Sequence, residues 1–166
     1  MEIMGLDLSI TATGVCLPDR TTYTIKTKTV DRDRRINVIR DRIAADLWGV
    51  DLVILEDFTS GLMGAASHAL GLTHGAVRAL LMDFGVPYVI VSPKTLKAYA
   101  TDNGNADKAA MILAAYKRGD REFRDDNQCD AWWLHVAGQD QVGEALFTLP
   151  QVQRARLDKV DWTPAP

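Results

Sequence analysis

The chain has 166 residues, of which 47% are hydrophobic and 25% charged, and this balance is typical of one compact domain with a substantial core. It excludes disorder over most of the chain. The two cysteines lack metal-ligand spacing, which argues against a disulfide framework or a zinc site. Charges interrupt the hydrophobic runs before they reach bilayer-spanning length, so we expect a cytoplasmic protein without a membrane partner.

The formal net charge of −3 does not decide whether the partner is a nucleic acid. Nucleic-acid-binding proteins usually carry a surplus of Lys and Arg, which this chain lacks. Its basic residues are nevertheless grouped, in residues 94–118 and again in residues 154–159. A carboxylate cluster neutralised by bound metal would leave the remaining charges near balance.

The first part of the chain predicts three consecutive strands and a helix. Residues 2–8 and 12–17 are short runs rich in Ile, Leu and Val with turn-forming Ser and Thr between them, which indicates adjoining antiparallel strands. Residues 21–29 alternate Thr, Tyr, Ile and Lys, as a half-exposed third strand does. Residues 34–48 predict an amphipathic helix, because isoleucines recur there at helical spacing.

Strands and helices alternate in the rest of the chain. Residues 51–58 and 86–91 are apolar runs typical of strands covered on both faces, and the small-residue-rich stretch 65–84 between them predicts a long helix. Further helical segments are expected after Ser92 and Pro93, at residues 106–118 and at residues 126–136.

This order of elements predicts an α/β fold. We expect a mixed five-stranded sheet, with three antiparallel strands followed by parallel strands, and helices on both faces. Residues 1–148 would form this domain. Residues 149–166 contain three prolines and alternating charges, so we expect a loosely docked C-terminal tail.

Carboxylates occur at three places where apolar runs predict buried structure: Asp7 in the first strand, Glu56 at the end of the fourth, and Asp126 with Asp130 in the last helix. Neighbouring strands lie about 5 Å apart, where like charges repel unless a cation or a proton intervenes. Asp126 and Asp130 are four residues apart and so share a helix face. Oxygen ligands without nearby His or Cys favour Mg²⁺ or Mn²⁺. Two such ions would suit hydrolysis of a nucleic-acid backbone.

Each carboxylate also has a structural interpretation. Asp7 would cap a turn, Glu56 would pair with an arginine at a strand end, and Asp125 or Asp126 would be the N-cap of the last helix. Asp130 is harder to explain in this way, because it lies one turn inside an apolar helix.

Four segments in this order resemble RuvC-type Holliday-junction resolvases of the ribonuclease-H-like superfamily, with a phage-encoded member expected: GLDLSITATGV, VILEDF, SPKTLKAYATDNGNADKAAM and DDNQCDAWWL. The match covers residues 1–137. The strand aspartate followed by Gly14 is shared with actin-like ATPases. The pattern from Pro93 through Lys97 and Gly104 to Lys108 is more particular to resolvases.

The resemblance implies a homodimer that nicks two opposed strands of a four-way DNA junction with two Mg²⁺ ions per site, leaving ligatable ends. It implies Asp7, Glu56 and Asp130 as metal ligands. Bacterial members usually carry a carboxylate or histidine three residues before the last aspartate, where this chain has Asn127. We expect Asp126, the nearest carboxylate, to be the fourth ligand, although the Asn127 oxygen remains an alternative.

The resemblance also implies residues that contact DNA. Lys97 and Lys108 match basic positions that offset charge on the scissile phosphate, so Lys108 joins the expected catalytic group, and Lys94 is expected to bind DNA beside them. Phe58 resembles the aromatic residue that stacks at the junction centre, but it lies two rather than three residues after Glu56. Solvated surface lysines and core packing are the alternatives.

Two other function classes share some of these features. A noncatalytic branched-DNA-binding protein would need the basic residues but not the repulsive carboxylates. An actin-like or sugar-kinase-type ATPase would share the opening strand pair, but it needs a second domain to close over its nucleotide.

Overall fold

The computed structural model describes residues 1–31, 33–58 and 65–165. One sheet forms its centre, with the strand order β3-β2-β1-β4-β5. The strands β1, β2 and β3 are antiparallel neighbours, whereas β4 pairs in parallel with β1 and β5. The strands are β1 (Ile3–Asp7), β2 (Ala12–Cys16), β3 (Thr22–Lys26), β4 (Leu52–Glu56) and β5 (Tyr88–Val91).

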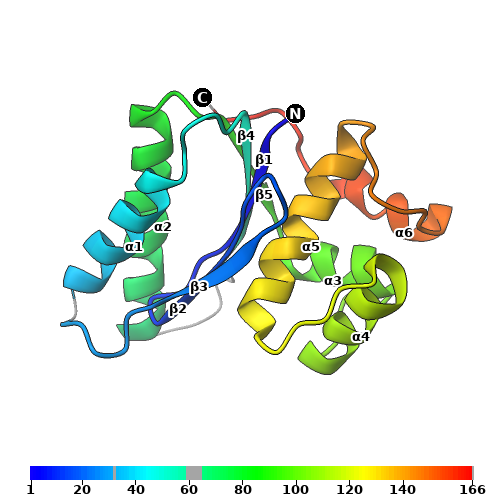
Figure 1. Ribbon diagram of the computed structural model, residues 1–166, viewed down its shortest axis with the longest axis horizontal. Coiled ribbons are helices and arrows are strands. Elements are labelled where there is room, and N and C mark those ends of the chain that lie inside the picture. Colours follow the sequence, from blue (N-terminus) through cyan, green and yellow to red (C-terminus); the bar gives the residue numbers. More distant parts are fainter. Residues whose placement is uncertain (32, 59–64, 166) are drawn as a thin grey trace.

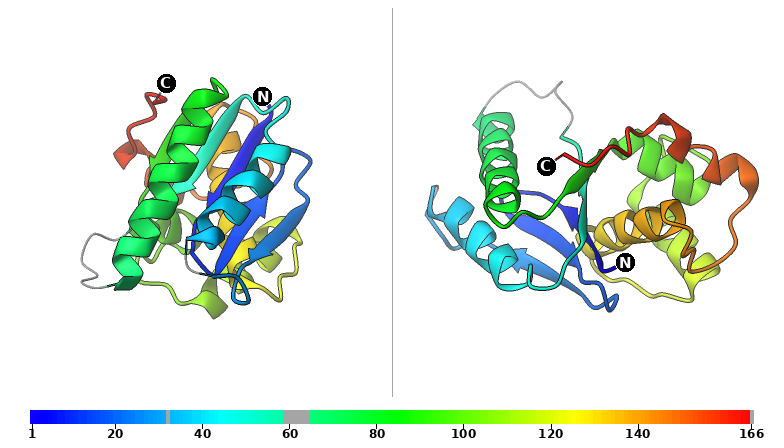
Figure 2. Two further views of the ribbon diagram at one scale, coloured as in Figure 1. Left: turned by 90° about the vertical axis from the view of Figure 1, so that its left-hand side faces the viewer. Right: turned by 90° about the horizontal axis from the view of Figure 1, so that it is seen from above.

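Helices cover both faces of this sheet, as predicted (Figures 1 and 2). One face carries α1 and α2, and the other carries α3 to α6. None of the described helices is both long and apolar enough to cross a membrane. The helices are α1 (Arg34–Ala45), α2 (Ala65–Asp83), α3 (Pro93–Thr101), α4 (Lys108–Gly119), α5 (Asp126–Gln141) and α6 (Gln151–Arg154), followed by the 3-10 turn η1 (Leu157–Lys159).

Strand β4 shows why an unbroken apolar run predicts a central strand. Its side chains alternate between two cores, because successive residues of a strand point to opposite faces. Leu52 and Ile54 join the core beneath α3, α4 and α5, whereas Val53 and Leu55 join the core beneath α1 and α2. Both faces of the strand are therefore buried, and no polar position is left until Glu56.

Helix α5 lies directly on strands β1 and β2. A Cβ atom on Gly5 would overlap the carbonyl oxygen of Ala131, and one on Gly14 would overlap the carbonyl oxygen of Asn127. The two strands therefore carry glycine where the helix backbone comes closest. This close approach fixes the first turns of α5 over the carboxyl end of β1.

Helix α5 extends five residues beyond the predicted end at residue 136, through Gln141. The sequence gives no sign of this, because Gln139 and Asp140 look like exposed helix-ending residues. In the structure Asp140 is buried and accepts hydrogen bonds from the Tyr99 hydroxyl (3.1 Å) and the Arg154 Nε (3.1 Å). Its partners come from elements distant in sequence.

The C-terminal segment packs more extensively than a loosely docked tail would. Arg154 pairs with Asp140 at 2.5 Å and Arg156 with Asp102 at 2.8 Å. Leu157 is buried against the core beneath α3, α4 and α5. A backbone bridge between Tyr88 and Ala165 then places the end of the segment beside β5. Two cations of the second basic group therefore form ion pairs within the molecule.

The close approach of α5 generates a stability prediction. Gly14→Ala should destabilise the protein by about 3 kcal/mol, or roughly 10 °C in melting temperature, because its Cβ must displace the α5 backbone. Gly71→Ala is the matched control, since a Cβ there meets open space within α2 and should stabilise the helix by about 0.5–1 kcal/mol. Thermal unfolding measures both. An unchanged melting temperature for Gly14→Ala would contradict the packing.

Candidate active site

Asp7 and Glu56 end two adjacent parallel strands at the same edge of the sheet. Leu6 is paired with Leu55, so the two carboxylates follow in register. Strand periodicity turns Asp7 to the same face as Gly5, and Glu56 to the same face as Ile54, which is the face that α5 covers. The two carboxyl groups lie within hydrogen-bonding reach of each other, which lowers the pKa of Asp7 and raises the pKa of Glu56.

Asp130 joins this pair from the second turn of α5. Burial, followed by the charge of Asp130, raises the pKa of Asp7 to about 7. Burial and the neighbouring Asp7 hold the pKa of Glu56 well above its usual range. Burial and the charge of Asp126 raise the pKa of Asp130 to about 6. These carboxyl groups therefore share one poorly solvated environment in which their negative charges repel.

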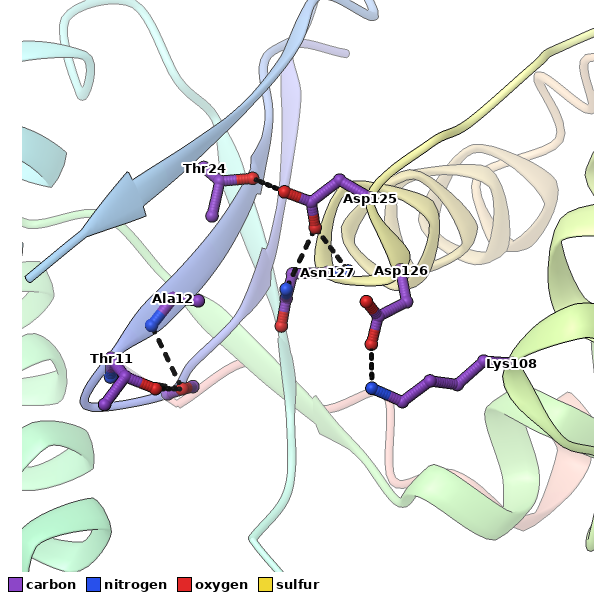
Figure 3. Close-up of polar contacts among 8 residues, drawn as sticks. Thr11, Ala12, Thr24, Lys108, Asp125, Asp126 and Asn127 are labelled. Atoms are coloured by element: carbon purple, nitrogen blue, oxygen red, sulfur yellow. Dashed lines mark hydrogen bonds and ion pairs between the residues drawn. The ribbon is translucent and has the colours of Figure 1, made fainter. Parts of the chain in front are cut away.

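Asp125, rather than Asp126, caps the start of α5 (Figure 3). Its carboxylate accepts hydrogen bonds from the Asn127 backbone N–H (3.0 Å) and side-chain amide (2.9 Å), and from the Thr24 hydroxyl of β3 (2.6 Å). The cap therefore occupies the Asn127 amide nitrogen and leaves Asp126 free for another partner.

The partner of Asp126 is Lys108, the first residue of α4, with which it forms an ion pair (Figure 3). The Lys108 side chain is otherwise exposed, and its positive charge also interacts electrostatically with Asp7 and Asp130. Two expected catalytic residues are thus brought together, and both lie beside the carboxyl cluster.

The other three predicted DNA-contacting residues lie on the other side of Glu56. Phe58, Lys94 and Lys97 line a groove of about 360 Å³, together with Asp57, Ser92, Pro93 and Gly104. The positive charge of Lys97 partly opposes the upward shift in the pKa of both Glu56 and Asp130. The Phe58 ring packs on His74 with 5.1 Å between the centroids, so the ring is partly committed to packing.

The donor chemistry of the cluster fits a hard divalent cation, since every candidate ligand is a carboxylate and a cation would relieve their repulsion. The side chains are not yet arranged as such a site. Within residues 1–31, 33–58 and 65–165, no group of three or more His, Cys, Asp or Glu residues is positioned to hold a metal ion. Binding would require the side chains to rearrange, with Asp126 leaving Lys108.

Sequence reasoning missed one long-range contact and one residue of the site. Asp125 was one of two alternatives for the helix cap, and its bond to Thr24 across more than one hundred residues of sequence had no signal. Gly5 also had no assigned role. Its position two residues before Asp7, and therefore on the same strand face, could have indicated that a helix packs closely there.

Comparisons with solved structures identify similar folds. RuvC from Thermus thermophilus has a TM-score of 0.69 at 22% sequence identity, covering 87% of this chain and 98% of that one. The same values hold for T. thermophilus RuvC in complex with a Holliday junction substrate. The yeast mitochondrial Holliday junction resolvase Ydc2 has a TM-score of 0.49 at 14% identity, covering 94% of this chain and 80% of that one.

Neither a comparison with protein-family models nor one with curated proteins finds a match for this chain. The likeness to the Thermus protein establishes the fold: the mixed five-stranded sheet with helices on both faces is ribonuclease-H-like. The fold class predicted from the sequence is confirmed.

The raised pKa of Asp7 predicts how stability depends on pH. In the unfolded chain the pKa would be near 3.8, against about 7 when folded. The folded protein therefore binds more protons between these values, and its stability falls as pH rises through this window. In EDTA, the melting temperature of the wild type should fall between pH 5 and pH 8 by roughly 4–8 °C more than the melting temperature of Asp7→Asn does. This difference corresponds to a loss of about 2 kcal/mol in the free energy of unfolding.

The matched control for this measurement is Asp41→Asn, an exposed substitution on α1, across the sheet from the cluster. It should keep the wild-type pH profile. If Asp7→Asn also keeps that profile, the carboxyl groups do not repel one another as described.

Proposed function

We propose that the protein is an endonuclease that resolves four-way DNA junctions by magnesium-dependent hydrolysis of phosphodiester bonds. The observation that carries this proposal is the convergence of Asp7, Glu56 and Asp130 in one poorly solvated cluster with lysines beside it. The fold supports it, because Thermus thermophilus RuvC, which shares this fold, has been solved with a Holliday junction substrate.

The proposed ligands of two Mg²⁺ ions are Asp7, Glu56 and Asp130, with Asp126 as the fourth carboxylate after it leaves Lys108. Mn²⁺ is expected to substitute, because it shares the preference for oxygen ligands. When bound, the ions would activate water and offset the charge that grows on the phosphate. The Asn127 amide oxygen would be a weaker ligand than the Asp126 carboxylate, because it carries no charge.

The remaining residues would position the DNA. Water adds to phosphorus and the bond to the 3′ oxygen breaks, which leaves a 5′-phosphate and a 3′-hydroxyl that a ligase can rejoin. Lys108 would move from Asp126 to the scissile phosphate, since the ion pair breaks when Asp126 binds metal. Lys94 and Lys97 would hold the neighbouring backbone in their groove, where the exposed side of Phe58 offers a surface for a base.

A second copy of the chain is the proposed partner, because paired nicks in a junction need two active sites. Helix α2 offers the surface for it. Leu72 and Met82 are 46% and 53% exposed on this helix, with exposed Gly75 and Ala79 between them at helical spacing. Such a small-residue stripe lets two helices approach closely, and burying it would remove exposed apolar surface.

A noncatalytic junction-binding protein is the competing function, and one observation favours it. Lys108 neutralises Asp126 in the structure, and no ready group of three metal-binding side chains exists among the described residues. The raised pKa values argue the other way, because a protein that only binds DNA gains nothing from burying mutually repelling carboxyl groups.

Asp130→Asn separates these two functions. The nicking rate on a synthetic four-way junction in Mg²⁺ should fall at least about a hundredfold, since a metal ligand is lost. Affinity for the junction, measured in EDTA, should be equal or higher, because removing negative charge eases the approach of DNA. Asp41→Asn serves as the control that loses the same charge on the opposite face. A wild-type protein that binds the junction tightly but never cuts it would establish the noncatalytic function.

The dimer is tested by light scattering after size-exclusion chromatography. Wild type should have twice the mass of one chain, and Leu72→Glu/Met82→Glu should have the mass of a monomer, because two buried charges oppose the helix contact. Leu113→Glu, on α4 with 50% exposure, is the control and should remain dimeric. A monomeric wild type at micromolar concentration would contradict the proposal.

A further inference from the structure

A second groove lies beside the candidate active site, on the side away from Lys94 and Lys97. It has a volume of about 680 Å³ and is lined by Thr11, Lys26, Lys28, Arg124, Asp126 and Gln128, among others. Asp126 belongs to both this groove and the carboxylate site. We call it the β2–β3 groove, because the ends of these strands form its floor.

We propose that the β2–β3 groove binds the sugar-phosphate backbone of a nucleic-acid strand that crosses the carboxylate site. This inference rests on the proposed function and deepens it. The strand would enter through the groove of Lys94 and Lys97, pass the carboxylates, and continue over Lys26, Lys28 and Arg124. No role in binding was predicted for these last three residues.

The free charge of the β2–β3 groove is positive. Lys26, Lys28 and Arg124 are exposed, and none of them forms an ion pair with another residue in the part of the chain that the structure describes. Of the two acidic residues of the groove, Asp126 is neutralised by Lys108, whereas Asp125 keeps its charge in the helix cap and is outnumbered by the three cations. Three unpaired cations around a concave surface are what phosphate oxygens require.

The sheet topology places this groove in line with the site. Strand β1 ends at Asp7, and the chain turns back so that β2 begins at Ala12, which pairs with Lys26 at the end of β3. The ends of β1, β3 and β4 therefore lie at one edge of the sheet. In the order β3-β2-β1-β4-β5, Lys26 is two strands, or about 10 Å, to one side of Asp7.

The other groove lies on the opposite side in the same order, since Ser92 follows β5 and Phe58 follows β4. The carboxylates are thus between two cation-lined grooves along a single edge. A strand bound in only one groove would leave the scissile phosphate at the end of its contacts, whereas a strand bound in both is held on each side of it.

Edge protection is the structural alternative for Lys26. Strand β3 is an edge strand, and lysine on such strands deters pairing with other molecules. This alternative does not extend to Lys28 and Arg124, because Lys28 follows the strand and Arg124 precedes α5. Cations from two separate elements converge on one groove, which edge protection does not require.

The test compares Lys26→Gln/Lys28→Gln with the control Lys117→Gln/Arg118→Gln, which removes the same charge near the far end of α4. The probe is a fluorescein-labelled synthetic four-way DNA junction, titrated in EDTA between about 50 and 200 mM salt. Each lost phosphate contact lowers the slope of log affinity against log salt by about 0.7–0.9. The β2–β3 variant should lose about 1.5 in slope and roughly tenfold in affinity, and the control should keep the wild-type slope.

Arg124→Gln is the second variant and should lower the slope by about 1, so that misfolding of the double variant does not decide the question. A wild-type slope in both β2–β3 variants overturns the inference. So does an equal loss in the control, which would reflect net charge alone. Self-association of Lys26→Gln/Lys28→Gln at an unchanged slope would also overturn it and assign the lysines to edge protection.

Failure of the proposed function gives a different result. A wild-type protein that binds the junction without nicking it in Mg²⁺ refutes the nuclease, while the slopes still decide whether the groove binds the strand. A wild-type protein that does not bind the junction refutes both.

Discussion

Helix α5 contacts strands β1 and β2 so closely that only glycine fits at positions 5 and 14, and the rest of the site depends on this contact. The strand ends supply Asp7 and Glu56, but a third carboxylate reaches them only because the helix lies on the sheet without intervening side chains. The cap at Asp125 and its bond to Thr24 then fix where the helix begins. Backbone packing thus determines the position of Asp130.

The cost of this arrangement is electrostatic. Carboxyl groups from three elements lie half-buried beside one another, and each has a raised pKa because poor solvation and neighbouring negative charge both disfavour ionisation. Lys97 and Lys108 offset part of the repulsion from the rim of the site. The carboxylates repel one another without a cation, and a bound cation would offset this repulsion. Such a cluster is suited to a metal-dependent reaction.

Local patterns were sufficient for the five strands, for the helices α1 to α5 apart from their exact ends, and for the two strand carboxylates, but not for α6 and η1. Period-two and helical spacing gave the element order, and parallel strands that end in acidic residues indicated a shared edge for Asp7 and Glu56. Features set by long-range contacts were missed. The ion pair between Asp140 and Arg154 stabilises the last turn of α5 and also holds residues 149–166 against the domain. The lysines of the β2–β3 groove looked like ordinary edge-strand residues.

The central claim is that carboxylates from β1, β4 and α5 form one cation site. Crystals of the wild-type protein soaked in Mn²⁺, measured near the manganese absorption edge, test it most directly. The account predicts anomalous density within ligand distance of Asp7, Glu56 and Asp130, with Asp126 released from Lys108. Density elsewhere on the molecule, or an unchanged Lys108 ion pair with no bound ion at saturating Mn²⁺, would contradict it.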